Sequence, residues 1–392
     1  MNQGSVISSR VRHIPESATM SVADTAAELR KEGRDVISFS LGEPDFETPE
    51  NVKQAAKTAL DRGETHYTQA SGIPELREAI AEKLTNENGL AVSPADVLVT
   101  PGAKQAIFEA VCTLIDQGDE VAVFDPAWVS YEAIVRFAGG KPVLIPVFER
   151  DNFMPVDLQN HVTRETKLLI LNSPCNPTGA VYEKNVIKDV AEVAEDNDVF
   201  VLSDEVYEKI IYEAKHHSIG SLIPDTTITV NGFSKAYAMT GWRLGYATAA
   251  APILKGMLKV QQHSVSNATS FAQRAGVEAL RGDQGVVRAM VSEFKARRDL
   301  MIDRLRKAGI ECALPQGAFY AFARISQFGN SIAVTEKLLK KALVAVTPGS
   351  AFGPNGEGYV RLSYATSRRN IEEGTDRIKM TLDKGLSTSL DA

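Results

Sequence analysis

The 392-residue chain has only three cysteines and no apolar run long enough to cross a membrane. Cys112, Cys175 and Cys312 form an odd set without metal-type spacing, so we expect neither a disulfide framework nor a cysteine-bound metal. Two of them lie in apolar or turn contexts that suit buried free thiols, which favours a reducing compartment. The N-terminal residues lack the apolar core of a signal peptide, so we expect the protein in the cytoplasm.

A strong charge of one sign is also lacking. The chain has 43 Lys and Arg against 50 Asp and Glu, which gives a formal net charge of -7. The basic residues are scattered, so neither nucleic acid nor an anionic membrane is an expected partner. There is no internal repeat or low-complexity segment, and the length suffices for one large and one smaller domain.

Apolar runs predict a buried sheet. Most are rich in Val, Ile and Leu without polar alternation, as in parallel strands that are covered on both faces. Helical patterns lie between several of them, at 103–115 and 183–196, and this order predicts an α/β sheet with crossover helices. The predicted strands are 97–100, 120–124, 167–171, 199–203, 227–230 and 244–248.

Polar groups follow the ends of five predicted strands. Open α/β sheets bind ligands at the carboxyl ends of their strands, so these groups are candidates for one site. They are the segments 102–104, 125–128, 172–179 and 204–207 and the residue Lys235.

Lys235 follows the strand 227–230, and Arg243 comes eight residues later. A lysine amine held among apolar groups has a lowered pKa and becomes a nucleophile toward aldehydes. A guanidinium suits a phosphate dianion, which it can bind through two parallel hydrogen bonds. An ordinary surface loop would explain this segment about equally well if it stood alone. The other strand-end groups favour a site for a phosphate-bearing aldehyde.

The chain resembles the class I/II pyridoxal-phosphate-dependent aminotransferases of fold type I, and its pattern is most similar to prokaryotic-type aspartate aminotransferases. The resemblance spans nearly the whole length and is carried by the segments 40–46, 66–77, 172–179, 228–246 and 359–365. It implies a large domain with a mostly parallel seven-stranded sheet covered by helices, and a smaller α+β domain from both chain ends. We expect an arm and part of the small domain in 1–46, the cofactor domain in 47–284, and a linking helix with the rest of the small domain in 285–392.

The resemblance implies pyridoxal 5'-phosphate as the cofactor. Lys235 would bind it as a Schiff base and then act as general base. Asp204 would keep the ring nitrogen protonated, which makes the ring an electron sink. Tyr207, one helical turn after Asp204, would join Asn176 in hydrogen-bonding the ring's 3'-oxygen. A helix N-cap is the alternative for Asp204, and a plain turn is the alternative for the Asn176-Pro177 segment, where a cis bond is also expected.

The phosphate needs several donors. Gly102, Ala103 and Lys104 begin a predicted helix, whose free N–H groups and positive dipole suit an anion. Arg243 would add the charged clamp. By resemblance, Tyr67 reaches the phosphate of a neighbouring subunit, which implies a homodimer.

Two further residues complete the expected cofactor site. By resemblance, Trp128 lies on the pyridine ring, although an interior or interface tryptophan is an equal alternative on the residues alone. Many relatives carry a hydroxyl where this chain has Gly232, and we expect Ser234 to substitute for it in part.

The expected substrates are an amino acid and a 2-oxo acid. Arg361 lies on an apolar strand-like segment, where an arginine is costly unless it pairs with an anion, and the family's α-carboxylate arginine occupies this motif. Gly42 is similar to the glycine whose backbone approaches the substrate, and Trp128 and Asn176 would also contact it. Lys104 and Thr19 resemble residues of the prokaryotic-type enzymes that help bind the second carboxylate of a dicarboxylic substrate.

The resemblance thus implies the reaction of L-aspartate with 2-oxoglutarate to give oxaloacetate and L-glutamate, with ping-pong kinetics. Aromatic amino acids or prephenate are alternative substrates, and Lys104 could instead serve the phosphate or lie in solvent. A C–S lyase or a cyclopropane-carboxylate synthase with the same cofactor is a second alternative. A non-catalytic effector-sensing module is a third, but no DNA-binding segment precedes Gly42.

The C-terminal part predicts a long helix at 285–308, strands at 317–323, 343–347 and 359–364, and helices at 335–342 and 371–384. The glycine-rich segment 349–358 lies between two predicted strands, so it is no dinucleotide fingerprint.

Overall fold

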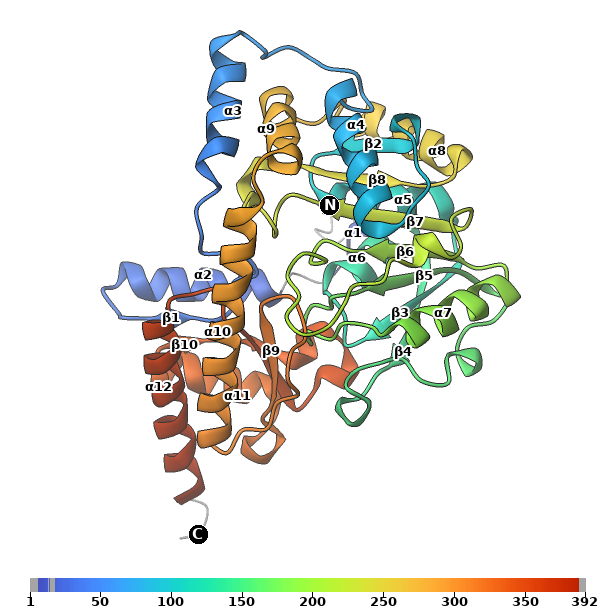
Figure 1. Cartoon of the computed structure of the whole chain (residues 1–392). Coiled ribbons are helices and arrows are strands. Elements are labelled where there is room, and N and C mark those ends of the chain that lie inside the picture. Colours follow the sequence, from blue (N-terminus) through green and yellow to red (C-terminus); the bar gives the residue numbers. More distant parts are fainter. Residues whose placement is uncertain (1–5, 13, 15–17, 388–392) are drawn as a thin grey trace.

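A mostly parallel sheet of seven strands forms the centre of the larger part of the molecule (Figure 1). The computed structural model describes residues 6–12, 14 and 18–387. All neighbouring strands pair in parallel except β8, which is antiparallel to both of its neighbours. The strand order is β2 (Val97–Thr100), β8 (Gly245–Thr248), β7 (Thr227–Gly232), β6 (Phe200–Asp204), β5 (Thr166–Asn172), β3 (Glu120–Asp125) and β4 (Lys141–Pro146). The expected α/β class and seven-stranded sheet are confirmed.

The strand β4 was missed because its sequence carries Pro142 and Pro146 and reads poorly as a strand. It pairs only with β3, at the edge of the sheet, where a residue without an N–H is tolerated. The six predicted strands match the observed ones to within one or two residues at each end.

Helices cover both faces of the sheet, and the side chains of β5 point alternately to one face and the other. Leu168 and Ile170 pack in a cluster with α5 (Ala103–Leu114), α6 (Ser130–Ala138) and α8 (Ala251–Ser264). Leu169 and Leu171 point to the opposite face and pack with α7 (Lys184–Asp196). Such two-sided burial explains why the strands read as continuous apolar runs. A third cluster joins the β2–β8 edge to α3 (Glu50–Asp61), α4 (Pro74–Lys83) and α9 (Ser270–Arg281).

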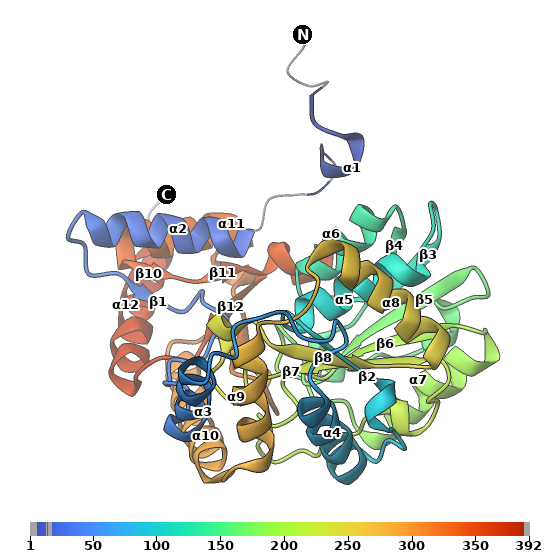
Figure 2. The same cartoon turned by 90° about the horizontal axis from the view of Figure 1, so that it is seen from above.

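The smaller part of the molecule combines both chain ends (Figure 2). The strand β1 (Ile37–Ser38) pairs in parallel with β10 (Val344–Ala345), and a separate sheet has the order β11 (Thr347–Pro348), β12 (Tyr359–Ser363) and β9 (Tyr320–Arg324). The helices of this part are α2 (Ala18–Lys31), α10 (Gly285–Lys307), α11 (Ser331–Lys337) and α12 (Arg368–Ser387). A short helix, α1 (Ser9–Arg12), precedes them. The exact domain boundaries at 46/47 and 284/285 stay a prediction.

Three local predictions were wrong. The strand expected at 343–347 is two short strands in different sheets, because the chain leaves one sheet for the other at Val346. Leu343, with a positive φ of 54°, precedes the first of them. The helix expected at 335–342 starts earlier, at Ser331, where the Asn330 side chain accepts from the N–H of Ala333, and it ends in a π-helical turn. The residues after Asp204 form turns, not a helix.

Within the described part of the chain, no helix combines the length and the apolar character needed to cross a bilayer.

Candidate active site

A cavity of about 330 Å³ lies where the two parts of the molecule meet at the carboxyl ends of β5 and β6. Parallel strands and the segments that follow them bring its polar groups together, as the strand-end pattern predicted. Its wall contains the sequence-predicted residues Gly42, Ala103, Lys104, Trp128, Asn176, Asp204, Tyr207, Ser234, Lys235, Arg243 and Arg361.

Lys235 follows the end of β7, and its Nζ donates a hydrogen bond of 2.6 Å to the carbonyl oxygen of Gly42. The ammonium lies 5.8 Å from the centroid of the Tyr207 ring. Burial lowers the pKa of Lys235 from its ordinary value near 10.5 to about 8, despite the opposing charge of Glu43. The amine is therefore neutral in a useful fraction of molecules near pH 8.

Asp204 ends β6 and is 4% exposed. The hydroxyl of Tyr131 donates to its Oδ2 at 2.6 Å, and the N–H of Val206 donates to its Oδ1 at 3.3 Å. Burial raises the pKa of Asp204 to about 6, although both hydrogen bonds act in the opposite direction. Since both of these hydrogen-bond partners are neutral, the charge of the carboxylate can pair with a cationic N–H donor of a ligand.

Tyr207 shares a short hydrogen bond with Tyr320, whose hydroxyl oxygen lies 2.7 Å from its own. Burial raises the pKa of Tyr207 well above its ordinary value, so the phenol stays protonated. An intact phenol can donate to an oxygen in the cavity.

Arg361 lies on β12 with only 3% of its surface exposed. It donates to the side-chain oxygen of Asn176 at 2.9 Å and to the carbonyl oxygen of Ser40 at 2.7 Å. Its Nε has no hydrogen-bond partner, and the guanidinium carbon lies 4.5 Å from the centroid of the Tyr320 ring. Burial lowers the pKa of Arg361. Among the described residues no carboxylate pairs with this buried cation, which is the condition expected of a site for an anionic ligand.

The N-terminus of α5 faces Arg243. Gly102 caps this helix with a positive φ of 89°, and a Cβ there would come within 2.6 Å of the Arg243 Nη2. The backbone angle therefore favours glycine, and a side chain there would also displace the Arg243 guanidinium. The free N–H groups of the helix and the adjacent guanidinium form an anion-binding arrangement.

Trp128 and Lys104 form another wall of the cavity. The Lys104 ammonium lies 4.8 Å from the centroid of the Trp128 ring, and that ring meets Tyr131 edge-on at 5.3 Å. The flat indole and the free charge suit a planar or anionic ligand.

Three predicted residues are not part of the cavity wall. Gly102 caps α5 directly before the wall residue Ala103. Tyr67 is 88% exposed at the surface of this chain, outside the cavity. Thr19 belongs to α2, but its side chain lies outside the described residues.

Several residues that line or support the site were given no role of their own from the sequence, although Asn172 lies in the predicted segment 172–179. Tyr131 lies on α6, where it reads as a core residue, and Tyr320 begins β9. Asn172 donates to the Asp204 carbonyl oxygen at 2.9 Å and accepts from the Asn176 N–H at 2.9 Å, so it holds both segments together. Ser40 contributes only a main-chain oxygen, which no sequence signal identifies.

The Asn176-Pro177 bond is cis, as the sequence suggested, and the Asp125-Pro126 and Ser173-Pro174 bonds are cis as well.

Comparisons with known proteins agree with this geometry. The sequence model of the family "Aminotransferase class I and II" matches residues 34–378. A probable aspartate/prephenate aminotransferase of Thermus aquaticus is 45% identical over 382 residues, which are 96% of this chain and 99% of its own length. The structure of an aspartate aminotransferase from Thermus thermophilus with maleate is similar with a TM-score of 0.93 and 44% identity, over 96% of this chain and 99% of that one. An aromatic aminotransferase from Pyrococcus horikoshii matches with a TM-score of 0.88 and 45% identity, over 92% of this chain and 99% of that one. The chain therefore belongs to the class I and II aminotransferases.

Proposed function

We propose that this protein transfers an amino group from L-aspartate to 2-oxoglutarate with pyridoxal 5'-phosphate as cofactor. The products are oxaloacetate and L-glutamate, and the kinetics are ping-pong. One observation carries the proposal: a lysine with a lowered pKa and a buried, unpaired arginine line the same cavity, together with a buried carboxylate. The family membership of the chain supports the choice of cofactor.

The donor set fits pyridoxal phosphate. Gly102, Ala103 and Arg243 would hold the phosphate, because the helix N-terminus and the guanidinium lie side by side. Asp204 would accept from the ring nitrogen, since its present partners are neutral. Lys104 and Ser234 are further candidates for the phosphate end.

The remaining groups would hold the ring and its substituent. Tyr207 and Asn176 are candidates for the 3'-oxygen, and Trp128 would lie against the ring face. When bound, pyridoxal phosphate supplies an aldehyde that binds amines covalently and a ring that takes up electrons as the α-proton leaves.

Lys235 has two roles in this proposal. Its amine would attach the cofactor, and its Nζ would then remove the α-proton from the substrate and return it. The pKa of about 8 supports the second role, because a base works best when its pKa is close to the operating pH.

Arg361 would bind the substrate's α-carboxylate through two parallel hydrogen bonds. The contact of its side chain with Asn176 would align that carboxylate with the cofactor end of the cavity. Gly42 would let the substrate approach, since a Cβ there would already lie 2.9 Å from the Tyr320 hydroxyl.

A second carboxylate would lie near Lys104, with Thr19 as a further candidate. The charge of Lys104 at the cavity wall and the similarity to proteins that carry the name aspartate aminotransferase favour a dicarboxylic substrate. Aromatic amino acids or prephenate are the second candidate, which the aromatic wall of Trp128 and the similarity to an aromatic aminotransferase favour.

We further propose a homodimer, to whose neighbouring site the exposed Tyr67 would contribute its hydroxyl. The three cysteines are free thiols, which supports a location in the cytoplasm.

A panel of amino donors against 2-oxoglutarate tests the reaction and its substrate. We expect aspartate to give the highest kcat/KM and to convert the visible absorption of the cofactor-bound enzyme to the pyridoxamine form. No spectral change with aspartate, or release of pyruvate or sulfide without an amino acceptor, would contradict the proposal.

A further inference from the structure

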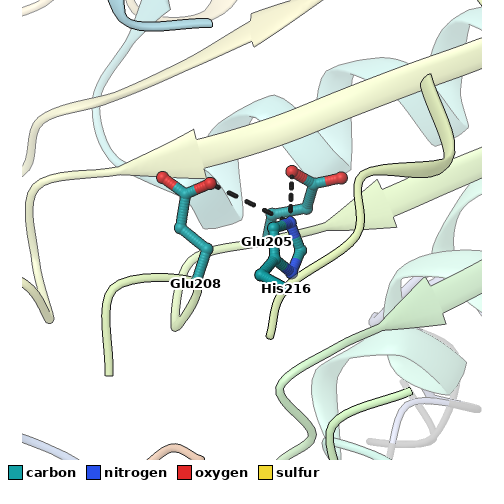
Figure 3. A group of neighbouring side chains, drawn as sticks. All are labelled: Glu205, Glu208 and His216. Carbon is teal, nitrogen blue, oxygen red and sulfur yellow. Dashed lines mark hydrogen bonds and ion pairs between the residues drawn. The ribbon is translucent and has the colours of Figure 1, made fainter. Parts of the chain in front are cut away.

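A second cluster of ionisable side chains lies behind the turn that follows β6. Glu205, Glu208 and His216 each offer a ligand atom, and these atoms lie within 4.8 Å of one another (Figure 3). A lysine already supplies a positive charge to the cluster, because Lys83 pairs with Glu208 and donates to the side-chain oxygen of Asn88 at 2.6 Å. The chain itself therefore offsets part of the negative charge of the acids, which disfavours a metal ion at this place.

The Glu205 carboxylate is saturated with hydrogen-bond donors. Its Oε1 accepts from the hydroxyls of Ser203 at 2.9 Å and Ser218 at 2.6 Å. Its Oε2 accepts from Asn88 Nδ2 at 3.0 Å and from His216 Nε2 at 3.0 Å. Glu205 is fully buried, and only an ionised carboxylate can accept at all of these positions.

The turn at 204–208 presents its side chains to two different environments. Asp204 and Tyr207 line the active-site cavity, whereas Glu205 and Glu208 belong to the buried cluster. The N–H of Glu205 donates to the Val230 oxygen at 2.9 Å, which ties the turn to β7. A displacement on one side of so short a segment must therefore move the side chains on the other.

The cluster also joins the turn to another helix. Lys83 ends α4, and Asn88 ends the π-helical turn that follows it. Asn88 Nδ2 reaches both Glu205 and Glu208, the latter at 2.6 Å. The position of the turn is thus set from α4, from outside the cavity.

We propose that Glu205 is a positioning residue for transamination, whose four-donor carboxylate fixes the turn that presents Asp204 and Tyr207 to the cavity. The inference rests on the proposed function, because that function gives Asp204 and Tyr207 their roles. A preorganised site loses activity when its supporting groups allow shifts of about 0.5–1 Å, so the effect of Glu205 reaches the reaction without contact to substrate or cofactor.

The test uses Glu205→Gln, which keeps the shape of the side chain but replaces one acceptor oxygen by a donor that faces other donors. We expect the affinity of the protein for added pyridoxal phosphate to fall about tenfold, and kcat to fall roughly ten- to hundredfold, as for outer partners of other preorganised sites. KM should change much less than kcat, because the Arg361 end of the cavity does not depend on this cluster.

A spectroscopic readout separates positioning from general destabilisation. The visible absorption of the bound cofactor would change with pH as its imine with Lys235 loses a proton, and hydrogen bonds to the 3'-oxygen would lower that imine's pKa. A weaker Tyr207 contact should therefore raise the pH midpoint of this change by about one unit. Ser218→Ala removes one donor to Glu205 and should shift the same midpoint in the same direction by less. Glu213→Gln is the matched control, because it removes a carboxylate that pairs with Arg298 at 2.6 Å outside the cavity wall.

If Glu205→Gln lowers Tm but leaves the midpoint and the cofactor affinity as in the wild type, Glu205 is a structural residue only and the inference is wrong. If Glu205→Gln does not fold, Ser218→Ala decides by the same two readouts. A wild-type protein that binds no pyridoxal phosphate would refute the proposed function, and this inference with it. If the wild type binds the cofactor and transaminates, but both variants keep its cofactor affinity and its pH midpoint, the inference alone is refuted.

Discussion

The guanidinium of Arg361 donates a hydrogen bond of 2.9 Å to the side-chain oxygen of Asn176, although 185 residues separate the two in sequence. Arg361 belongs to β12 of the smaller part, and Asn176 follows β5 of the large sheet. This contact joins the two parts at the cavity. Because the hydrogen-bond partners of Arg361 among the described residues are all neutral, its charge remains available for an anionic ligand.

Replacing Arg361 should impair substrate binding more than cofactor binding. Arg361→Lys keeps the charge but loses the planar guanidinium that can donate two parallel hydrogen bonds to a carboxylate. We expect kcat/KM to fall about 10²- to 10³-fold, which corresponds to the loss of two charge-assisted hydrogen bonds. The visible spectrum of the bound cofactor should not change. Arg368→Lys, at an exposed arginine that pairs with Glu293, is the control. Steady-state kinetics within a few-fold of the wild type for Arg361→Lys would show that this residue does not bind the carboxylate.

Asp204→Asn should stabilise the protein without its cofactor above pH 6. The folded-state pKa of about 6 lies above the ordinary 3.8, so the folded chain holds this proton more tightly than the unfolded chain. Stability is therefore lost as the pH rises from about 4 to 6, and the loss, up to ~3 kcal/mol, persists at higher pH.

Asparagine has no such titration. Urea unfolding at pH 8 should favour Asp204→Asn by ~1–3 kcal/mol, and the difference should shrink below pH 4. The same variant should lose nearly all turnover. A wild-type protein that is the more stable of the two at pH 8 would contradict the pKa assigned to Asp204.

Lys235 should react at unusually low pH in protein freed of cofactor. Its burial lowers the pKa to about 8, so its acylation by an amine-selective reagent should show a midpoint near that pH. Lys141, whose pKa is raised by its hydrogen bond with Glu120, should require a higher pH. Peptide mapping over a pH series measures both residues in one sample. Equal midpoints for the two lysines would refute the activated amine.

Tyr131→Phe tests the support of Asp204. The variant removes the 2.6 Å hydrogen bond that favours the ionised carboxylate, so the pKa of Asp204 should rise further. We expect kcat to fall about tenfold and the acidic limb of its pH profile to move to higher pH. Tyr182→Phe changes another buried tyrosine, one that does not line the cavity, and should leave the profile in place. A Tyr131→Phe profile that coincides with that of the wild type would exclude this support.

The sequence predicted the central sheet and most of the cavity for a physical reason. Buried parallel strands read as apolar runs, and their carboxyl ends converge, so Asp204 and Lys235 could be assigned to one site before their contacts were known. The edge strand β4 was missed because its prolines contradict the strand pattern.

The groups that support the site were harder to predict. Tyr131 lies on an amphipathic helix, where a tyrosine looks like a core residue, and its hydroxyl contact with Asp204 depends on how α6 packs. Main-chain groups such as the Ser40 and Gly42 oxygens leave no trace in the choice of side chain. The segment after β6 looked helical because Asp204 and Tyr207 are three residues apart, as on one face of a helix. A turn can place two such side chains on the same side as well.

The most direct test is borohydride treatment of the protein reconstituted with pyridoxal phosphate, followed by peptide mass spectrometry. We expect loss of the visible band and a single stable cofactor adduct on Lys235, absent from Lys235→Ala, which should also lack turnover. A protein that stays colourless, or an adduct on a lysine other than Lys235, would contradict the account.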